Sequence, residues 1–203
     1  MIQKLLVVAL CLTVLACASK PKAEAPPAVP TDGVIVVSLW YRAARLGDVE
    51  TLKRLSEDRE KQPIDRIDGN GVTALMVASR NGQVDAVRFL LANGADSKRA
   101  DKDWQTALSY AVLGSADDDK RKAVTRLLLE NGADPFLSDG YGAVPVREIV
   151  SLGYLEILKT LSFTDKSPCD RALPRRGDDS IVELARKSEQ EEVMKYLQSI
   201  GCR

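Results

Sequence analysis

The most constraining feature of this sequence is a segment that occurs twice, 33 residues apart. Residues 68–78 align with residues 101–111, and Asp, Thr, Ala, Leu and a second Ala recur in register. The later halves also match, because residues 89–96 align with residues 127–134 at an offset of 38, so five residues are inserted in the later copy. A period of this length predicts a stack of similar units rather than one globular core.

Each copy carries signals for two short helices. Thr73 and Thr106 lie where a hydroxyl can cap the start of a first helix. Asn81-Gly82 separates two apolar runs with helical spacing, as a turn between helices requires. Asn93-Gly94 offers a left-handed residue at the end of the second helix. Residues 95–103 are polar, which favours a projecting hairpin loop.

This pattern resembles the ankyrin repeat, whose 33-residue period contains T-P-L-H-x-A and closes on G-A-D. The resemblance implies an all-α repeat protein, an ankyrin-repeat solenoid of helix-turn-helix units joined by β-hairpin loops. Weaker copies flank the two strong ones, so we expect about five units with degenerate terminal caps. Their expected bounds are 38–67, 68–100, 101–138, 139–168 and 169–203.

The sequence departs from the ankyrin pattern in two respects. The usual His of T-P-L-H is replaced by Met76, Ser109 and Arg147, so its hydrogen bond to the neighbouring loop must be replaced or missing. Trp104 occupies a position that usually holds Gly. Because a left-handed backbone is strained for Trp, we expect the local loop to differ.

Residues 1–16 have the parts of a secretory signal peptide. Lys4 gives a positive start, and residues 5–15 form an apolar run that is too short to span a bilayer comfortably. After it comes an expected linker, residues 17–37, in which residues 19–31 contain four prolines; these favour an extended spacer with a reach of roughly 40 Å. We expect the folded domain to cover residues 38–203.

The end of the leader resembles the bacterial lipobox, because residues 14–17 read Val-Leu-Ala-Cys. This resemblance implies that Cys17 becomes the mature N-terminus and carries acyl chains. Ala18 and Ser19 follow it rather than Asp, which implies an outer-membrane lipoprotein that faces the periplasm. The alternative is an ordinary signal peptide cleaved near Ala16 or Ala18, and hence a secreted or periplasmic protein.

Two further cysteines remain after the leader. Cys169 and Cys202 are 33 residues apart, which is one repeat period. In an oxidising compartment such a pair predicts a disulfide that fastens the terminal unit. The alternative is two unpaired thiols.

The composition argues against most enzymatic chemistry. The sequence contains no histidine, which removes the commonest general base and the commonest zinc ligand. We therefore expect no enzyme, no cofactor and no metal. Lys plus Arg equals Asp plus Glu, 29 against 29, so no basic excess indicates nucleic-acid binding. The remaining enzymatic alternative is a hydrolase with paired carboxylates, which would need a closed acidic cleft.

The run Asp117–Lys122 within the insertion contains three acidic residues followed by three basic ones. It is interpreted either as a partner-specific epitope or as a solvated helix start, where acidic residues complement the positive end of a helix.

Ankyrin stacks bind with a concave surface made of first helices and hairpin tips. Trp104 and Tyr141 fall near adjacent tips, and large exposed aromatic residues commonly anchor interfaces. The alternative for Trp104 is that it packs onto its own repeat. The candidate partner-binding residues are Asn70, Val72, Arg80, Asn81, Lys102, Asp103, Trp104, Gln105, Leu113, Tyr141 and Leu152.

The sequence therefore predicts a protein-binding module that is tethered by lipid to the periplasmic face of the envelope and is monomeric when free. One use would be an immunity-type inhibitor of a toxin or lipase effector. The alternative use is a scaffold or chaperone that supports a periplasmic enzyme.

Overall fold

The computed structural model describes residues 33–57, 63–114, 116–161, 169 and 179–202. Within these residues the chain forms ten α-helices and no β-strand. The helices form consecutive pairs: α1 (Gly33–Leu46) with α2 (Val49–Ser56), α3 (Ala74–Arg80) with α4 (Val84–Ala92), α5 (Ala107–Val112) with α6 (Asp118–Glu130), α7 (Pro145–Ser151) with α8 (Leu155–Thr160), and α10 (Ile181–Lys187) with α11 (Glu191–Ser199).

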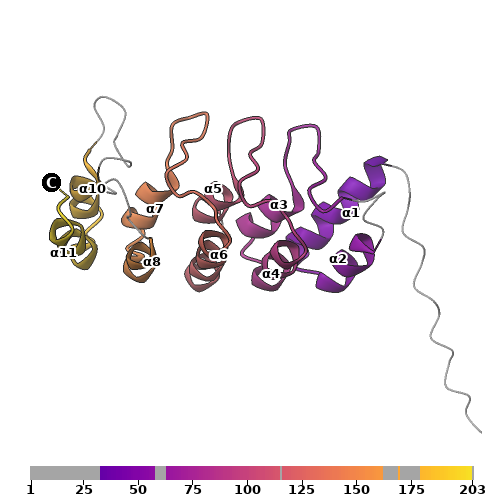
Figure 1. The fold of residues 1–203 in the computed structure, drawn as a ribbon, viewed down its shortest axis with the longest axis horizontal. Helices are drawn as coiled ribbons and strands as arrows, with labels where there is room; N and C mark the ends of the chain where they lie inside the picture. Colours follow the sequence, from indigo (N-terminus) through magenta and orange to yellow (C-terminus); the bar gives the residue numbers. More distant parts are fainter. Residues whose placement is uncertain (1–32, 58–62, 115, 162–168, 170–178, 203) are drawn as a thin grey trace, which may run out of the picture.

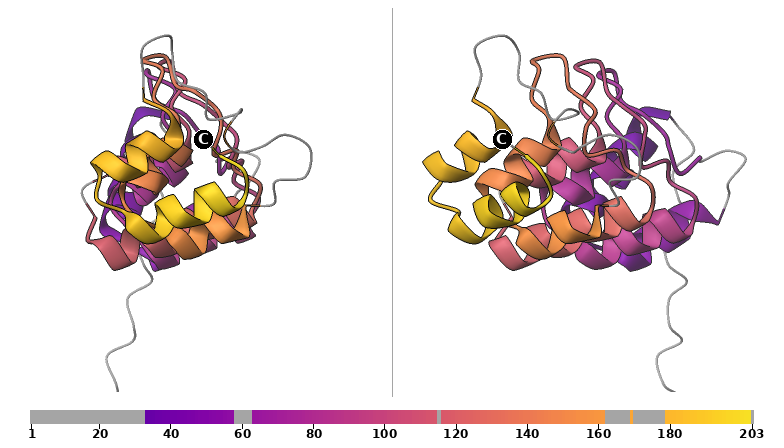
Figure 2. Two further views of the ribbon diagram at one scale, coloured as in Figure 1. Left: turned by 90° about the vertical axis from the view of Figure 1, so that its left-hand side faces the viewer. Right: turned by 60° about the vertical axis from the view of Figure 1, so that its left-hand side comes forward.

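The helix pairs stack in a single row (Figure 1). Each first helix packs against the next first helix, from α1 through α3, α5 and α7 to α10, and the second helices form a parallel layer. Hairpin loops project from one edge of this stack, which is clear in the end-on view of Figure 2. The ankyrin-repeat solenoid predicted from the sequence is confirmed.

Threonine caps start the first helices of the two strongest units. The Thr73 hydroxyl accepts a hydrogen bond from the Met76 backbone N–H at 3.3 Å, and the Thr106 hydroxyl accepts one from the Ser109 N–H at 3.4 Å. Gly94 follows α4 with a left-handed φ of 90°. These are the caps and the stop that the sequence predicts.

The core is one continuous apolar cluster that runs the length of the stack. Small residues such as Ala78 and Ala111 are fully buried on the first helices, where they let neighbouring units approach closely. Leu90 and Leu128 fill the space between first and second helices. A short helix pair buries its apolar side only against another pair, which is why the units stack.

Two details of the predicted architecture need correction. The helix α1 begins at Gly33, so the predicted linker 17–37 overlaps the folded domain; no proline follows Pro30 until Pro63, and nothing in the sequence stops the helix from starting before residue 38. The loops contain isolated β-bridges, such as Ile67 with Thr73, rather than strands. The leader and Cys17 lie outside the described residues.

Candidate protein-binding face

The loops before α3, α5 and α7 share one hydrogen-bonding pattern. Each contains an aspartate, and these are Asp68, Asp101 and Asp139. In each case Oδ1 accepts hydrogen bonds from the backbone N–H groups two and four residues further on, at 2.8–3.0 Å. Bonds of this kind fix a turn locally, so all three tips adopt the same backbone shape.

Neighbouring tips are also bonded to each other through the main chain. The Lys102 N–H donates to the Asn70 carbonyl at 3.0 Å, and the Gly140 N–H donates to the Asp103 carbonyl at 2.7 Å. The tips therefore form one edge with a fixed spacing. A partner that binds this edge does not have to order it first.

Tyrosine hydroxyls support two of the loops. The Tyr41 hydroxyl donates to the Val72 carbonyl and accepts from the Asp68 N–H at 2.9 Å, and the Tyr110 hydroxyl donates to Asp101 Oδ2 at 2.8 Å. Burial, helped by the nearby Asp68 carboxylate, raises the pKa of Tyr41 to about 12. Burial and the bond to Asp101 also raise the pKa of Tyr110. Both phenols therefore remain donors at neutral pH.

Trp104 keeps the left-handed backbone that glycine adopts at the equivalent positions. Its φ is 61°, against 84° for both Gly71 and Gly142. Its N–H donates to the Asp101 carbonyl at 3.1 Å, as the two glycines do to their own aspartates. The expectation that this loop differs is therefore wrong, because the Asp101 bonds impose the common shape on it.

Trp104 is 66% exposed, so the alternative in which its ring packs onto its own repeat is also wrong. A left-handed conformation costs a non-glycine residue about 1–2 kcal/mol. The fold thus holds a large aromatic ring in water at a strained position that a glycine would fill better.

Two other large apolar side chains are exposed on the same side. Tyr141 lies on the next tip and is 68% exposed, and Leu113 ends α5 and is 51% exposed. Between the third and fourth units lies a shallow, mostly apolar hollow. Its lining residues are Ser109, Val112, Leu113, Ala143, Val144, Pro145 and Glu148.

The remaining predicted residues fall into two groups. Exposed ones are Asn70, Arg80, Lys102 and Asp103, and partly buried ones are Val72, Asn81, Gln105 and Leu152. Two amides of the second group bond within the fold, since Asn81 Nδ2 donates to the Val77 carbonyl at 2.8 Å and Gln105 Nε2 donates to Asp139 Oδ2 at 3.2 Å. The side-chain amides of Asn81 and Gln105 therefore stabilise the face and are less available to a partner.

Sequence reasoning missed two arginines at the N-terminal end of this face. Arg42 and Arg45 are exposed on α1, and Arg45 lies two residues before the left-handed Gly47, as Arg80 lies two residues before Gly82. The signal was present in this shared spacing. The first unit is too degenerate for it to stand out without the structure.

The residues that replace the family's usual histidine have different roles. In α3 the Thr73 N–H donates to the Met76 sulfur at 3.4 Å, which completes a capping box. In α7 the Arg147 guanidinium donates to the Asp179 carbonyl at 3.0 Å, so it reaches the next unit. In the fourth unit, this hydrogen bond of Arg147 therefore replaces the one that the family's histidine usually makes to a neighbouring loop.

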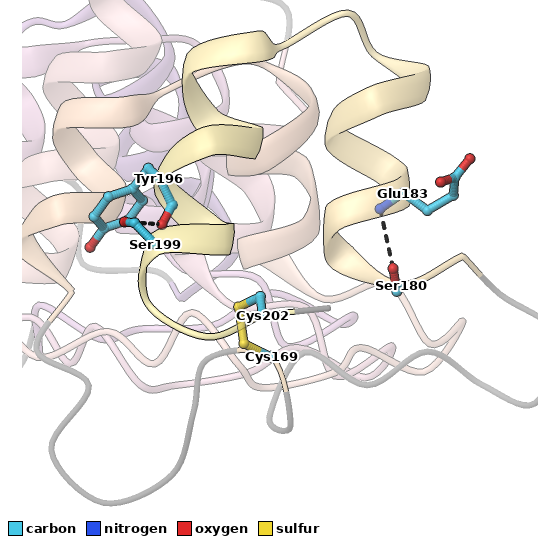
Figure 3. Close-up of a disulfide and its surroundings, with 6 residues drawn as sticks. All are labelled: Cys169, Ser180, Glu183, Tyr196, Ser199 and Cys202. Carbon is cyan, nitrogen blue, oxygen red and sulfur yellow. Dashed lines mark hydrogen bonds between the residues drawn. A yellow bond between two sulfur atoms is a disulfide. The ribbon is translucent and has the colours of Figure 1, made fainter.

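Cys169 and Cys202 form a disulfide next to the end of α11 (Figure 3), with their Cα atoms 5.3 Å apart. Cys202 is buried, and both cysteines contact the apolar cluster. On the neighbouring α10, the Ser180 hydroxyl caps the helix by accepting from the Glu183 N–H at 3.2 Å. The disulfide links the beginning of the last unit of the stack to its end.

The acidic run of the insertion starts α6. Asp117 is the N-cap and accepts from the Lys120 N–H at 3.0 Å. The hydrogen bonds from Lys122 and Tyr154 lower the pKa of Asp118, and the Tyr154 hydroxyl lies 2.6 Å from it. The interpretation as a helix start is confirmed, and the run has a structural use independent of any partner.

In the part of the chain that the structure describes, no three Asp, Glu or Cys side chains gather as a metal-binding group. None of its helices combines the length and the apolar character needed to cross a membrane.

Comparison with known proteins identifies the family. The ankyrin-repeat family profile, in three copies, matches residues 40–139. The cyclin-dependent kinase 4 inhibitor B of Bos taurus is 35% identical over 46% of this chain and 67% of its own length. A putative ankyrin repeat protein of Rickettsia bellii is 33% identical over 46% of this chain and 28% of its own length.

Other relatives are much longer proteins. A transient receptor potential channel subfamily A member 1 homolog from Caenorhabditis elegans is 24% identical over 65% of this chain. The chain spans 14% of that channel and 19% of the tyrosine-protein kinase HTK16 of Hydra vulgaris, which it also matches. The repeat pattern, the stacked helix pairs and these similarities agree: the chain belongs to the ankyrin-repeat family, a family of protein-interaction modules.

Proposed function

We propose that this protein is a non-catalytic binding module whose partner is another protein, held against the hairpin tips and first helices. The observation that carries the proposal is Trp104, which is both strained and exposed. Stability alone favours glycine at this position. A ring kept there at a cost in stability is expected where the ring has a use, and exposed Trp and Tyr are the commonest anchors of interfaces.

The proposed location is the periplasmic face of the bacterial outer membrane, with Cys17 as the lipidated residue. The lipobox-like residues 14–17 and the prolines after them support this proposal. Each buried methylene of an acyl chain contributes about 0.8 kcal/mol, so several chains together make a durable anchor. A disulfide between Cys169 and Cys202 also suits an oxidising compartment.

Within this function we favour inhibition of the partner, as in an immunity protein that blocks a toxin or lipase effector. A relative supports the preference for inhibition, because the similar protein of Bos taurus is by its name an inhibitor of a kinase. Deletion of the gene separates the two uses. Sensitivity to sibling cells would support immunity, whereas loss of an endogenous envelope activity would support a scaffold or chaperone.

The binding proposal is tested with the full chain, purified in detergent and offered an envelope fraction. The Trp104→Ala variant keeps the fold but removes the ring, so specific retention of a partner should fall more than tenfold. Arg126→Ala is the control, since Arg126 is exposed on the second helix α6, outside the hairpin tips and first helices of the proposed face. Equal retention by wild type and the Trp104→Ala variant would remove the basis of the proposal.

A further inference from the structure

The first helices carry a row of equivalent side chains along the proposed binding face. Each lies two residues before the left-handed residue that ends its helix, which is Gly47, Gly82, Gly153 or Glu189. Leu113 joins the row through the 33-residue repeat, because it aligns with Arg80. In chain order the row is Arg45, Arg80, Leu113, Ser151 and Lys187.

Contacts between helix ends bring the first members of this row together. Gln83 Nε2 donates to the Arg45 carbonyl at 2.9 Å, which ties the end of α1 to the turn after α3. A Cβ atom added to Gly114 would lie 2.4 Å from the Arg80 carbonyl oxygen, so the end of α5 touches the end of α3. Arg42 lies one turn before Arg45 on α1.

The ion pairing of the basic side chains differs between the two ends of this row. Arg42, Arg45 and Arg80 are exposed, and among the described residues no carboxylate lies within ion-pair distance of them. Lys187, at the far end, is paired instead with Asp179 at 2.7 Å.

Asp101 bonds to Tyr110, the ring that the Arg80 guanidinium faces, and both of its oxygens are already engaged. Asp101 uses one oxygen for its own loop and the other for the Tyr110 hydroxyl. The Arg80 guanidinium lies 6.0 Å from the Tyr110 ring centroid and makes no ion pair. Arg42, Arg45 and Arg80 therefore present guanidinium groups that make no ion pair within the described residues, and the exposed Leu113, Trp104 and Tyr141 follow them along the stack.

We propose that the partner presents an acidic segment followed by a large apolar side chain. This proposal rests on the proposed function and specifies the chemistry of its partner. Its carboxylates meet Arg42, Arg45 and Arg80, because guanidinium groups bind carboxylates with two parallel hydrogen bonds. The apolar side chain covers Leu113 and the hollow beside it.

A continuous polyanion fits this face less well than a protein segment. Glu148 lines the hollow that follows Leu113, and it would repel phosphates that extended beyond the arginines. The hollow itself is mostly apolar and offers a phosphate chain few donors.

The test selects random dodecapeptides displayed on phage against the full chain in detergent. Wild-type protein should enrich peptides with at least two Asp or Glu residues next to Leu, Phe or Trp. The double variant Arg45→Glu, Arg80→Glu should bind synthetic copies of these peptides more than tenfold more weakly. The double variant Arg88→Glu, Arg126→Glu makes the same change in net charge on α4 and α6 and should bind them like wild type.

Salt adds a second measurement. Raising the ionic strength from about 0.05 M to about 0.5 M shortens the screening length to roughly 4 Å, so affinity for the acidic peptides should fall several-fold or more. Peptides without acidic enrichment, or acidic peptides that both double variants bind equally, would overturn the proposal. So would stronger, Arg80-dependent retention of inorganic polyphosphate.

These failures differ from failure of the proposed function. If peptide binding depends on Trp104 but not on Arg45 and Arg80, the proposal of an acidic partner is wrong and the proposed binding face is retained. If no peptide is enriched and no envelope protein depends on Trp104, both proposals fail.

Discussion

The second and third units and the last unit of this stack are stabilised in different ways. The middle units have neighbours on both sides, and threonine caps start their first helices. The last unit has a neighbour on one side only, and it is held by the Cys169–Cys202 disulfide and the Arg147 bond to Asp179. The comparison indicates that a terminal unit replaces missing packing with covalent and polar links.

The largest expected effect follows from removing the disulfide. A bond that closes a loop of 33 residues stabilises a domain by about 3–4 kcal/mol on the chain-entropy account. Cys202→Ala should therefore lower the free energy of unfolding by about that amount, measured by urea denaturation. Hydrogen exchange should show the loss mainly in α10 and α11, because the middle units keep both neighbours.

Wild-type protein in reductant is the control for this prediction and should behave like the variant. If α3 to α6 lost protection as much as α10 and α11, the link would serve the whole stack, and the contrast between terminal and middle units would be wrong.

A smaller effect is expected at the helix starts. Thr106 caps α5, whereas Val144 precedes α7 and makes no side-chain cap bond. Thr106→Ala should cost about 1 kcal/mol because the Ser109 N–H loses its acceptor. Val144→Thr should instead stabilise by a few tenths of a kcal/mol, since it provides the missing acceptor. Thermal or urea denaturation of the two variants measures both, and loss of stability from Val144→Thr would show that its methyl packing matters more.

The sequence was sufficient for the fold because the repeat carries its own local rules. The Thr caps, the Asn-Gly stops and the G-A-D closes each specify a helix boundary, and two copies in register reveal the period. The binding face was only partly predictable. Exposed positions follow from the repeat, but it gives no sign that Gln105 would bond to Asp139.

Arg42 and Arg45 show the other reason for incomplete prediction. They belong to a degenerate unit, so their place on the face becomes visible only when α1 is seen packed on α3. Trp104 shows a third reason, because a conformational preference of one residue was outweighed by the hydrogen bonds of its loop. The preference of a single residue type for certain backbone angles does not take account of such bonds. Here the hydrogen bonds of the repeated aspartate determine the backbone conformation.

Trp104 also provides a prediction that separates stability from binding. A left-handed residue other than glycine costs about 1–2 kcal/mol, and the extra freedom of glycine in the unfolded chain offsets about 0.5–1 kcal/mol of that. Trp104→Gly should therefore raise the free energy of unfolding by about 0.5–1 kcal/mol while it weakens partner binding. The converse variant, Gly71→Trp, should destabilise the second unit, where an added Cβ would lie 3.2 Å from the Asp101 Cα. A loss of stability in Trp104→Gly would mean that the exposed ring has a structural role.

The smallest effect concerns acid, and it compares the second helices with one another. Asp48 caps α2, whereas Gln83 precedes α4 and makes no side-chain cap bond. Bonds from the Thr51 hydroxyl and N–H lower the pKa of Asp48 below its ordinary value. Because the folded-state pKa is the lower one, its contribution is present above the unfolded pKa of about 3.9 and is lost as the pH falls through the folded value.

Acid should therefore loosen α2 before α4. Backbone NMR shifts or hydrogen exchange, followed from pH 5 to about pH 2.5, would measure this difference. Asn caps a helix about as well as Asp but does not ionise, so Asp48→Asn should remove the difference between the two helices in this range. If α2 of this variant still loosened first in acid, the cause would lie in its terminal position in the stack rather than in the charge of its cap.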